Sequence, residues 1–277
     1  TSGGRGRSPG VDMVLRMASL EGPFPSLDQA SVFPDSWPAG RVPYLFGESF
    51  TRYITEKYGR DKLAEISTAY SGRGFPFLVQ STGLRVLKRH YGDLWWAWQN
   101  DLKYHYLKQQ QDILAKGPTR SAGLTRRGYL NIYPAISPDG TRIAYSVENG
   151  DEFPGIYLMN ADGSGDRKLV ENVFPGSASG AAVSWSPDNN RLFYTKIEIR
   201  RNTGYYNDIY YYDLKKDREV RLTKGLRARD PHLSPDGKRL IFVQNRMGRT
   251  RLAMMELSPG RRRPVGQKDI TPVTSES

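Results

Sequence analysis

The three histidines are the residues of this chain best suited to metal binding or acid–base chemistry. They are His90, His105 and His232, and none lies in an H-E-x-x-H segment or in another pair with metal-ligand spacing. We expect His90 and His105 to border helix faces and His232 to lie in a strand. The chain has no cysteine, which excludes disulfide bonds and thiolate ligands. The sequence therefore predicts no metal and no cofactor bound by this chain.

Two short segments match functional motifs only in outline. Residues 6–10 fit the pattern G-x-S-x-G, but a nucleophile elbow needs a strand before the serine and a helix after it. Here Ser8 stands in a Gly-rich stretch, and Pro9 follows it directly. Residues 160–166 look like a calcium loop without the bidentate glutamate downstream. We interpret residues 1–10 as a loop and the second segment as a turn between strands.

A four-residue turn sequence occurs three times, with a period of 48–49 residues. In each copy a proline fixes φ and an aspartate can bond its own backbone, while the Gly or Asn in fourth place tolerates a positive φ. Such turns between apolar runs are typical of β-hairpins. The residues are Ser137, Pro138, Asp139 and Gly140; Ser186, Pro187, Asp188 and Asn189; and Ser234, Pro235, Asp236 and Gly237.

The rest of each repeat predicts further strands. A basic residue and an apolar run follow each turn, and aromatic or apolar runs come next at residues 155–159, 208–212 and 251–255. Short fourth runs follow, as at residues 166–170 and 219–223. Four short strands in a unit of about 40–50 residues form a β-propeller blade. A solenoid of helical hairpins would need long stretches with a period of 3.6 residues, which the repeats lack.

These segments resemble the TolB-type propeller repeat, a relative of the WD-repeat blade, over roughly residues 125–277. The resemblance implies three blades of four antiparallel strands, at about 125–172, 173–225 and 226–277, in which each Ser-Pro-Asp turn joins two adjacent strands. A propeller needs at least about four blades to close. We therefore expect an open, partial propeller with an exposed sheet edge, and further blades in a longer parent protein. The resemblance also implies an exported bacterial protein, periplasmic or extracellular.

Residues 1–117 have a different pattern, which predicts helices. Apolar residues at helical spacing indicate one helix that ends at Gly59, another that begins near Asp61 and a third that ends at Gly92. The longest helix is expected from Asp93 to Gly117, and the prolines of residues 22–43 predict extended connections. The fold class is therefore multidomain, with an α-helical domain at 1–117 and an all-β domain at 118–277. The expected inner stripe of the longest helix is Leu94, Trp98, Leu102, His105, Gln109 and Ile113.

Residues 42–59 begin Val-Pro-Tyr-Leu-Phe-Gly and continue as an amphipathic helix. Together with residues 91–98 they resemble the C-terminal helical part of gluzincin-type (peptidase MA-like) zinc metallopeptidases. In that family H-E-x-x-H and a further glutamate hold zinc, and a downstream tyrosine helps to stabilise the oxyanion. By this resemblance Tyr44 is the candidate catalytic residue, and zinc belongs to a longer parent that carries the missing motif. The other interpretation packs the Tyr44 ring against Phe50 or Tyr53.

The net charge of +12 is concentrated near the end of the chain, since half of it falls in residues 226–277. A basic patch attracts nucleic acid, anionic lipid or an acidic protein. We interpret this one as a solvated face, and nucleic acid is not an expected partner, because stacking aromatics do not alternate with the basic residues. No apolar run approaches 18 residues, so no membrane span is predicted. The basic residues include Arg227, Arg229, Arg246, Arg249, Arg251, Arg261, Arg262 and Arg263.

Three functions fit these features. The first is a piece of an exported zinc metallopeptidase-like protein whose propeller binds a protein or peptide; this chain alone is then expected neither to retain zinc nor to cleave peptides. The second is a non-catalytic adaptor that binds proteins through the propeller. The third is the propeller region of a serine peptidase of the dipeptidyl-peptidase type. We rank it last because helices precede the blades and no hydrolase strand pattern surrounds them.

Overall fold

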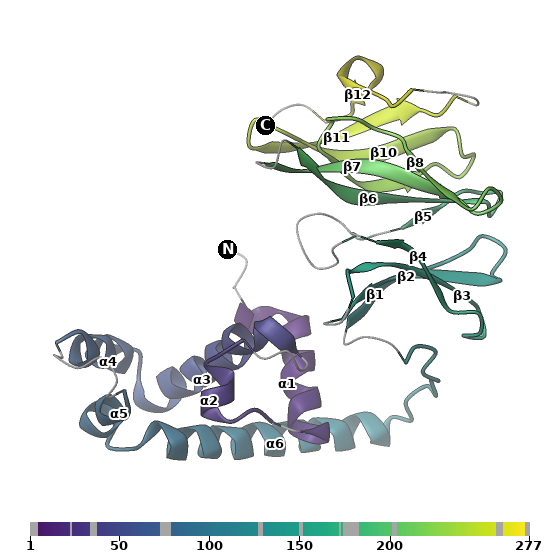
Figure 1. The fold of residues 1–277 in the computed structure, drawn as a ribbon. Helices are drawn as coiled ribbons and strands as arrows, with labels where there is room; N and C mark the ends of the chain where they lie inside the picture. Colours follow the sequence, from purple (N-terminus) through teal and green to yellow (C-terminus); the bar gives the residue numbers. More distant parts are fainter. Residues whose placement is uncertain are drawn as a thin grey trace. The chain divides into compact units, whose positions relative to one another are not determined.

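The computed structural model describes residues 5–22, 24–33, 38–72, 79–126, 130–149, 152–171, 173, 183–200, 204–258 and 263–274. The chain divides into two compact units, residues 1–121 and 122–277. The first unit is helical and the second consists of β-sheets (Figure 1). The sequence placed the boundary after residue 117, four residues earlier.

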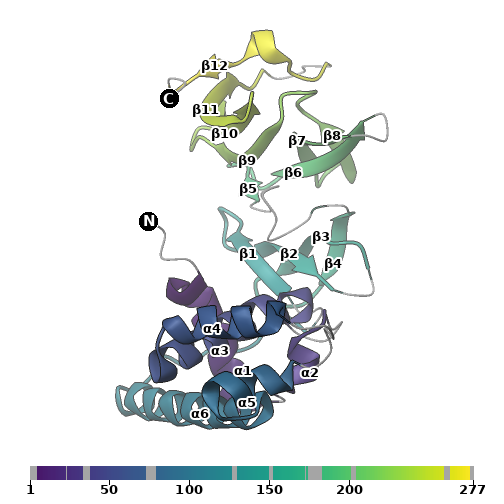
Figure 2. The same ribbon diagram turned by 90° about the vertical axis from the view of Figure 1, so that its left-hand side faces the viewer.

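The helical unit is built around one long helix, α6. Helices α1 and α3 pack on α6, and α4 packs with α5 (Figures 1 and 2). Short 3-10 turns precede α1 and α3. The helices are α1 (Pro9–Glu21), α2 (Leu27–Ala30), α3 (Val42–Tyr58), α4 (Asp61–Ser71), α5 (Gln80–Leu87) and α6 (Tyr91–Ala115).

Aromatic rings form the centre of this unit. Trp95 and Trp98 of α6 are buried with their ring centroids 4.6 Å apart, and Phe50 of α3 meets Trp95 edge-on at 5.0 Å. The Trp95 indole N–H donates to the carbonyl oxygen of Pro25 at 3.1 Å. Large aromatic side chains contribute strongly to burial, so these contacts fix α3 and the segment before α2 against the first turns of α6.

Helix α1 shows that the predicted loop at residues 1–10 was wrong in its last part. Ser8 is the N-cap residue of α1 and Pro9 is its first helical residue. Proline suits this position because the first N–H groups of a helix have no partner within it. The segment that fits G-x-S-x-G is therefore the start of a helix, whose buried residues are Val11, Val14, Leu15 and Ala18.

Residues 22–43 are less extended than predicted. Helix α2 begins there with a capping box, in which Ser26 Oγ accepts the Gln29 N–H at 3.3 Å and the Ser26 N–H donates to Gln29 Oε1 at 2.9 Å. A 3-10 turn at Ala39–Arg41 leads into α3, which has Pro43 in its first turn. Pro23 and residues 34–37 lie outside the described residues.

The boundary between α5 and α6 also differs from the prediction. Helix α5 ends at Leu87 and is followed by Lys88 in the left-handed conformation, at φ +58°, so Gly92 does not close it. Gly92 instead lies in the first turn of α6, which begins at Tyr91 rather than at Asp93. The left-handed residue after α5 is therefore a lysine, although glycine is the usual residue in that conformation.

The inner stripe of α6 was predicted correctly only in its first half. His105 is exposed and Ile113 is 44% exposed, whereas Tyr106 is buried. The series Leu94, Trp98 and Leu102 continues at a spacing of four residues to Tyr106. The Tyr106 hydroxyl donates to Asp12 of α1 at 3.0 Å. The side of α6 that packs on α1 therefore carries Tyr106, and His105 points away from it.

The second unit contains three four-stranded antiparallel sheets, as predicted. The strands of each sheet pair in chain order, and every Ser-Pro-Asp turn lies between the first and second strands of a sheet. The first sheet is β1 (Leu130–Ile136), β2 (Arg142–Glu148), β3 (Gly155–Asn160) and β4 (Arg167–Glu171). The second is β5 (Ser184–Trp185), β6 (Arg191–Arg200), β7 (Gly204–Asp213) and β8 (Arg218–Arg221). The third is β9 (Ala228–Leu233), β10 (Arg239–Arg246), β11 (Arg249–Glu256) and β12 (Thr271–Pro272).

The three sheets follow one another in chain order (Figures 1 and 2), and apolar side chains pack between neighbouring sheets. Leu158 and Tyr194 belong to the core between the first and second sheets, and Ile209 and Phe242 to the core between the second and third. The described residues form an open, partial propeller and no closed ring. In the part of the chain that the structure describes, none of the helices has the length and apolar character needed to span a membrane.

Candidate functional site: a groove along the first strands

The three repeated turns are closed by the same hydrogen bonds. In the first, Ser137 Oγ donates to Asp139 Oδ1 at 2.6 Å, and Asp139 also accepts the Thr141 N–H at 3.0 Å. The Arg142 N–H donates to Ser137 Oγ at 2.9 Å. Donation by Ser137 and Thr141 lowers the pKa of Asp139 to about 2. Equivalent bonds close the turns at 186–191 and 234–239, so these serines and aspartates hold the turns.

The fourth position of each turn has a positive φ, at +72° for Gly140, +60° for Asn189 and +69° for Gly237. Asparagine tolerates this conformation better than most residues. Its side chain also reaches the neighbouring blade, because Asn189 Oδ1 accepts the Asp139 N–H at 3.1 Å. The Asn189 carbonyl oxygen accepts a second bond, from the Arg142 guanidinium at 2.6 Å. The copy that departs from Ser-Pro-Asp-Gly therefore makes a contact between blades.

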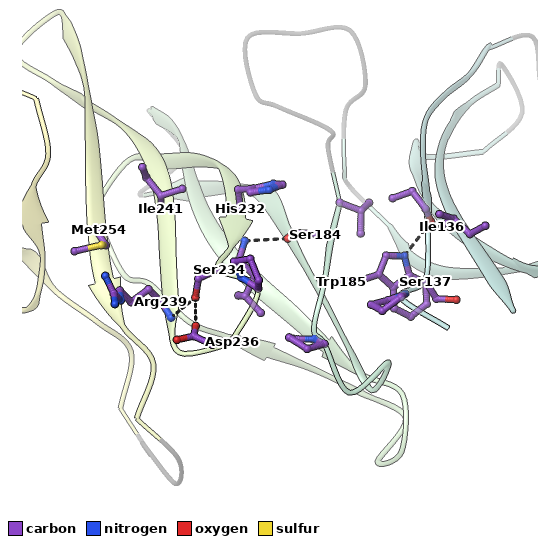
Figure 3. Close-up of a pocket in the computed structure, with 16 residues that line it drawn as sticks. Ile136, Ser137, Ser184, Trp185, His232, Ser234, Asp236, Arg239, Ile241 and Met254 are labelled. Carbon is purple, nitrogen blue, oxygen red and sulfur yellow. Dashed lines mark hydrogen bonds between the residues drawn. The ribbon is translucent and has the colours of Figure 1, made fainter. Parts of the chain in front are cut away.

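Further contacts bring the first strands of the three blades side by side (Figure 3). Trp185 Nε1 of β5 donates to the carbonyl oxygen of Ala135 in β1 at 2.9 Å. The Leu233 N–H of β9 donates to Ser184 Oγ of β5 at 3.0 Å. The Arg142 guanidinium also lies 5.2 Å from the centre of a Trp185 ring, a cation–π contact. The two-residue strand β5 is thus held from both sides.

A groove of about 1090 Å³ follows these strands and the turns beside them (Figure 3). Trp185 and Leu233 are buried in its lining, and Ile136 is 62% exposed. The ionisable side chains among the described lining residues are His232, Asp236 and Arg239. The remaining apolar lining includes Ala135, Val183, Ile241, Met254 and the turn prolines Pro138, Pro187 and Pro235.

The groove is suited to binding rather than to nucleophilic chemistry. Ser137 and Ser234 donate their hydroxyl protons to the aspartates of their own turns, and Ser184 Oγ accepts a backbone N–H. Apolar pockets with a few placed polar groups are typical of ligand sites. Among the described residues, no group of three His, Cys, Asp or Glu side chains is placed to hold a metal ion.

The family described as TolB beta propeller domain (PD40) matches residues 117–276. The chain belongs to this TolB propeller family. Among curated proteins, the TolB homolog of Chlorobium luteolum is 28% identical over 144 residues, which are 50% of this chain and 30% of that protein. The chain therefore spans less than a third of the length of that relative.

Solved structures similar to the TolB-like unit cover only part of each molecule. TolB from Acinetobacter baumannii is 22% identical, covering 55% of this chain and 34% of that one, with a TM-score of 0.42. A prolyl endopeptidase is 18% identical, covering 53% of this chain and 22% of that one, with a TM-score of 0.40.

Two other predicted features lie in the TolB-like unit. Residues 161–166 connect β3 to β4, as predicted for a turn between strands, and Asp162 accepts the Ser164 N–H at 2.9 Å. Gly163 has a φ of +85°, which explains the glycine there. His232 lies in β9, as predicted, and lines the groove.

Tyr44 belongs to the helical unit, outside the TolB match. It lies in the first turn of α3 and is 50% exposed, with its ring centroid 6.1 Å from that of Phe33. Phe50 stacks on Tyr53 at 6.4 Å, so those two rings contact each other. Among the ring pairs of the described residues, Tyr44 pairs with Phe33. The catalytic role of Tyr44 stays a prediction.

The apolar residues of the groove were not predicted from the sequence. Ile136, Trp185 and Leu233 each directly precede a Ser-Pro-Asp turn. Aligning the three repeats would have shown that a large apolar residue occupies this position in every copy. The alignment would not have distinguished exposed Ile136 from buried Trp185 and Leu233, because their burial depends on the neighbouring blade.

Proposed function

We propose that the TolB-like blades bind a peptide or an extended protein segment along the groove. The observation that carries the proposal is the apolar groove beside the first strands of three consecutive blades. Strands β1, β5 and β9 each stand at the end of their sheet, so one backbone edge of each has no strand partner among the described residues. Extended peptides bind such edges through main-chain hydrogen bonds, while adjacent pockets select their side chains.

Peptides selected from a random phage-displayed library against the full chain are the probe for this function. Ile136→Glu places a charge among the apolar lining residues, where an unpaired charge is costly to bury. We expect this variant to bind the selected peptides at least about tenfold more weakly than the wild type, a loss of about 1.4 kcal/mol.

Ile199→Glu is the matched control. Ile199 is also a strand residue and is also 62% exposed, but it lies on β6 and is not part of the groove lining. Equal losses in both variants, or a library selection without enrichment, would overturn the assignment of the groove.

We further propose, from the resemblance of residues 42–59, that the chain is part of an exported zinc metallopeptidase-like protein of the periplasm or cell exterior. The half-exposed position of Tyr44 at the start of α3 supports this origin. The described residues of this chain do not themselves fit a catalytic zinc ion, because they offer no set of three ligands.

The coding sequence upstream of this chain tests the origin. An H-E-x-x-H helix there supports the peptidase, and an upstream domain without it favours the non-catalytic adaptor. For the 277-residue chain itself, metal analysis after dialysis should find no stoichiometric zinc, and a generic peptide substrate should stay intact. One tightly held zinc ion per chain would contradict this expectation.

A further inference from the structure

A second cavity, of about 320 Å³, lies between the second and third blades. It lies at the strand ends where β7 begins and β10 ends. In a meander sheet these strand ends are opposite the Ser-Pro-Asp turns, so this site is distinct from the groove. Its lining is Tyr205, Tyr206, Asn207, Arg227, Asn245, Arg246 and Gly248.

Arg227 is held in place by its own surroundings. Its guanidinium carbon lies 4.4 Å from the centre of the Tyr206 ring. Its backbone has a φ of +51°, and its carbonyl oxygen accepts the Asn245 N–H at 3.1 Å. The preceding residue, Leu226, donates its N–H to buried Asp208 at 3.1 Å. Strained backbone fixed by its neighbours is common at binding sites, and a pre-positioned side chain loses less entropy on binding.

Within the part of the chain that the structure describes, the positive charge of this site lacks carboxylate partners. Arg246 faces Arg249 directly across the β10–β11 hairpin, an arrangement that destabilises a hairpin. Among the described residues, no carboxylate lies within ion-pair distance of Arg227, Arg246 or Arg249. The acidic groups Glu198 and Asp208 nearby are both paired with Arg221, at 3.2 Å and 2.6 Å. A bound anion would relieve the repulsion between the arginines.

Exposed apolar side chains stand beside these arginines. Met247, in the β10–β11 turn, is 86% exposed, and Tyr205 and Ile199 are 75% and 62% exposed. Ile199 and Tyr205 are directly paired across the β6–β7 hairpin. The interpretation of the basic residues as a merely solvated face rested on the lack of nearby aromatics in the sequence. The fold supplies those aromatics from the neighbouring blade.

We propose that this tip patch, defined as Ile199, Tyr205, Arg227, Arg246, Met247 and Arg249, docks on the surface of an anionic phospholipid bilayer. The phosphate of one headgroup occupies the cavity between Arg227 and Arg246, and the apolar side chains enter the interface. Basic residues adjacent to exposed aromatic and aliphatic side chains are typical of surfaces that lie in the headgroup region. A freely soluble phosphate would use the arginines but leave the apolar side chains without a role.

Vesicle co-sedimentation of the full chain tests the proposal, with vesicles of phosphatidylcholine alone and with about one third phosphatidylglycerol. We expect binding only to the anionic vesicles. An arginine near such a surface changes affinity about fivefold, so removing two of them by Arg227→Gln with Arg246→Gln should weaken binding about 25-fold. Arg246→Gln with Arg249→Gln leaves the Tyr206 stack untouched and should have a similar effect. Tyr205→Ser with Met247→Ser should weaken the binding that remains at high salt.

Lys215→Gln with Arg218→Gln is the charge-matched control. It removes two exposed positive charges at the β7–β8 connection of the second blade, at the opposite end of that blade from the tip patch. Retained vesicle binding in this variant supports the tip patch, and an equal loss would reduce the effect to net charge. Absence of binding to anionic vesicles would overturn the proposal. So would complete displacement by millimolar glycerol phosphate, which would identify a soluble phosphate as the ligand instead.

Discussion

A single carboxylate, Asp208, joins the second blade to the segment that leads into the third. It is fully buried and accepts hydrogen bonds from Arg221 at 2.6 Å and from Thr223 Oγ1 at 2.9 Å. It also accepts the N–H groups of Gly225 and Leu226, at 2.8 Å and 3.1 Å. Both oxygens of the Asp208 side chain therefore accept hydrogen bonds, which offset the cost of burying a carboxylate.

Asp208→Ala should destabilise the TolB-like unit by about 3–5 kcal/mol, because it leaves Nη2 of Arg221, the Thr223 hydroxyl and two backbone N–H groups without their acceptor. Urea unfolding followed by circular dichroism measures the change. The control is Glu256→Ala, which removes one partner of an exposed pair with Arg239 at 3.7 Å and should change stability by no more than about 0.5 kcal/mol. Similar effects of the two substitutions would contradict the assigned role of Asp208.

The turn aspartates should make the blades sensitive to acid. The pKa of Asp139 is lowered to about 2, from an unfolded value of about 3.9. A carboxyl group with a lowered pKa in the folded state contributes stability above the unfolded pKa and loses it as pH falls toward the folded one. The pH window for this loss is therefore about 4 to 2.

Asp139→Asn keeps the shape of the side chain but cannot ionise. We expect this variant to melt below the wild type at pH 7 and to approach the wild-type melting temperature as pH falls toward 2, where about half of the Asp139 side chains are themselves protonated. Thermal melts across this range measure the difference. A difference that stays constant from pH 7 to pH 2 would show that ionisation of Asp139 does not stabilise the turn.

At the scale of elements, the first helix of the helical unit, α1, packs against its last helix, α6. Leu15 of α1 is 1% exposed, and the buried Tyr106 hydroxyl of α6 donates to Asp12. Burial, followed by this hydrogen bond, raises the pKa of Tyr106. The contact stabilises α1, because an isolated helix of this length is marginal in water.

Leu15→Ala should destabilise the helical unit by about 2–5 kcal/mol, through lost burial and the cavity left behind. The measurement is the loss of helical circular dichroism at 222 nm with increasing urea. Met13→Ala is the matched control on the same helix, because Met13 is 48% exposed, and it should change stability by less than about 0.5 kcal/mol. If both substitutions had the same small effect, α1 would not be docked as described.

At the scale of the whole molecule, the outer face of the third sheet remains partly uncovered. Ile241, Val243, Leu252 and Met254 alternate with residues of the inner core, and Leu252 is 39% exposed. Exposed apolar sheet faces and free edges promote association. In the described open propeller no further blade covers this face, so its apolar residues stay partly exposed.

The full chain should therefore self-associate with increasing concentration, as measured by sedimentation equilibrium. Leu252→Glu should raise the concentration needed for association by about tenfold, since it places a charge on the apolar face. Thr119→Glu introduces the same charge at an exposed position in the segment after α6, outside the third sheet, and is the control that should leave association nearly unchanged. A wild-type chain that stays monomeric at all concentrations would contradict the expectation.

The sequence by itself determined the fold class, the number of blades and the place of each Ser-Pro-Asp turn. These features depend on local chemistry: the φ of proline, the tolerance of Gly140, Asn189 and Gly237 for positive φ, and the alternation of apolar residues along short strands. It also located most of the helices. It missed α1 and misplaced the second half of the α6 stripe, because both depend on contact between residues more than 90 positions apart, such as Asp12 and Tyr106.

Only the tertiary structure decided which side chains come together. The groove unites Ile136, Trp185 and Leu233 from three repeats, and the second cavity sets Tyr206 of one blade against Arg227 at the entry to the next. No periodicity within a repeat specifies such a pair, because it arises from the stagger and twist with which one sheet packs on another. The repeat therefore predicts each blade, whereas the surfaces that bind are properties of neighbouring blades together.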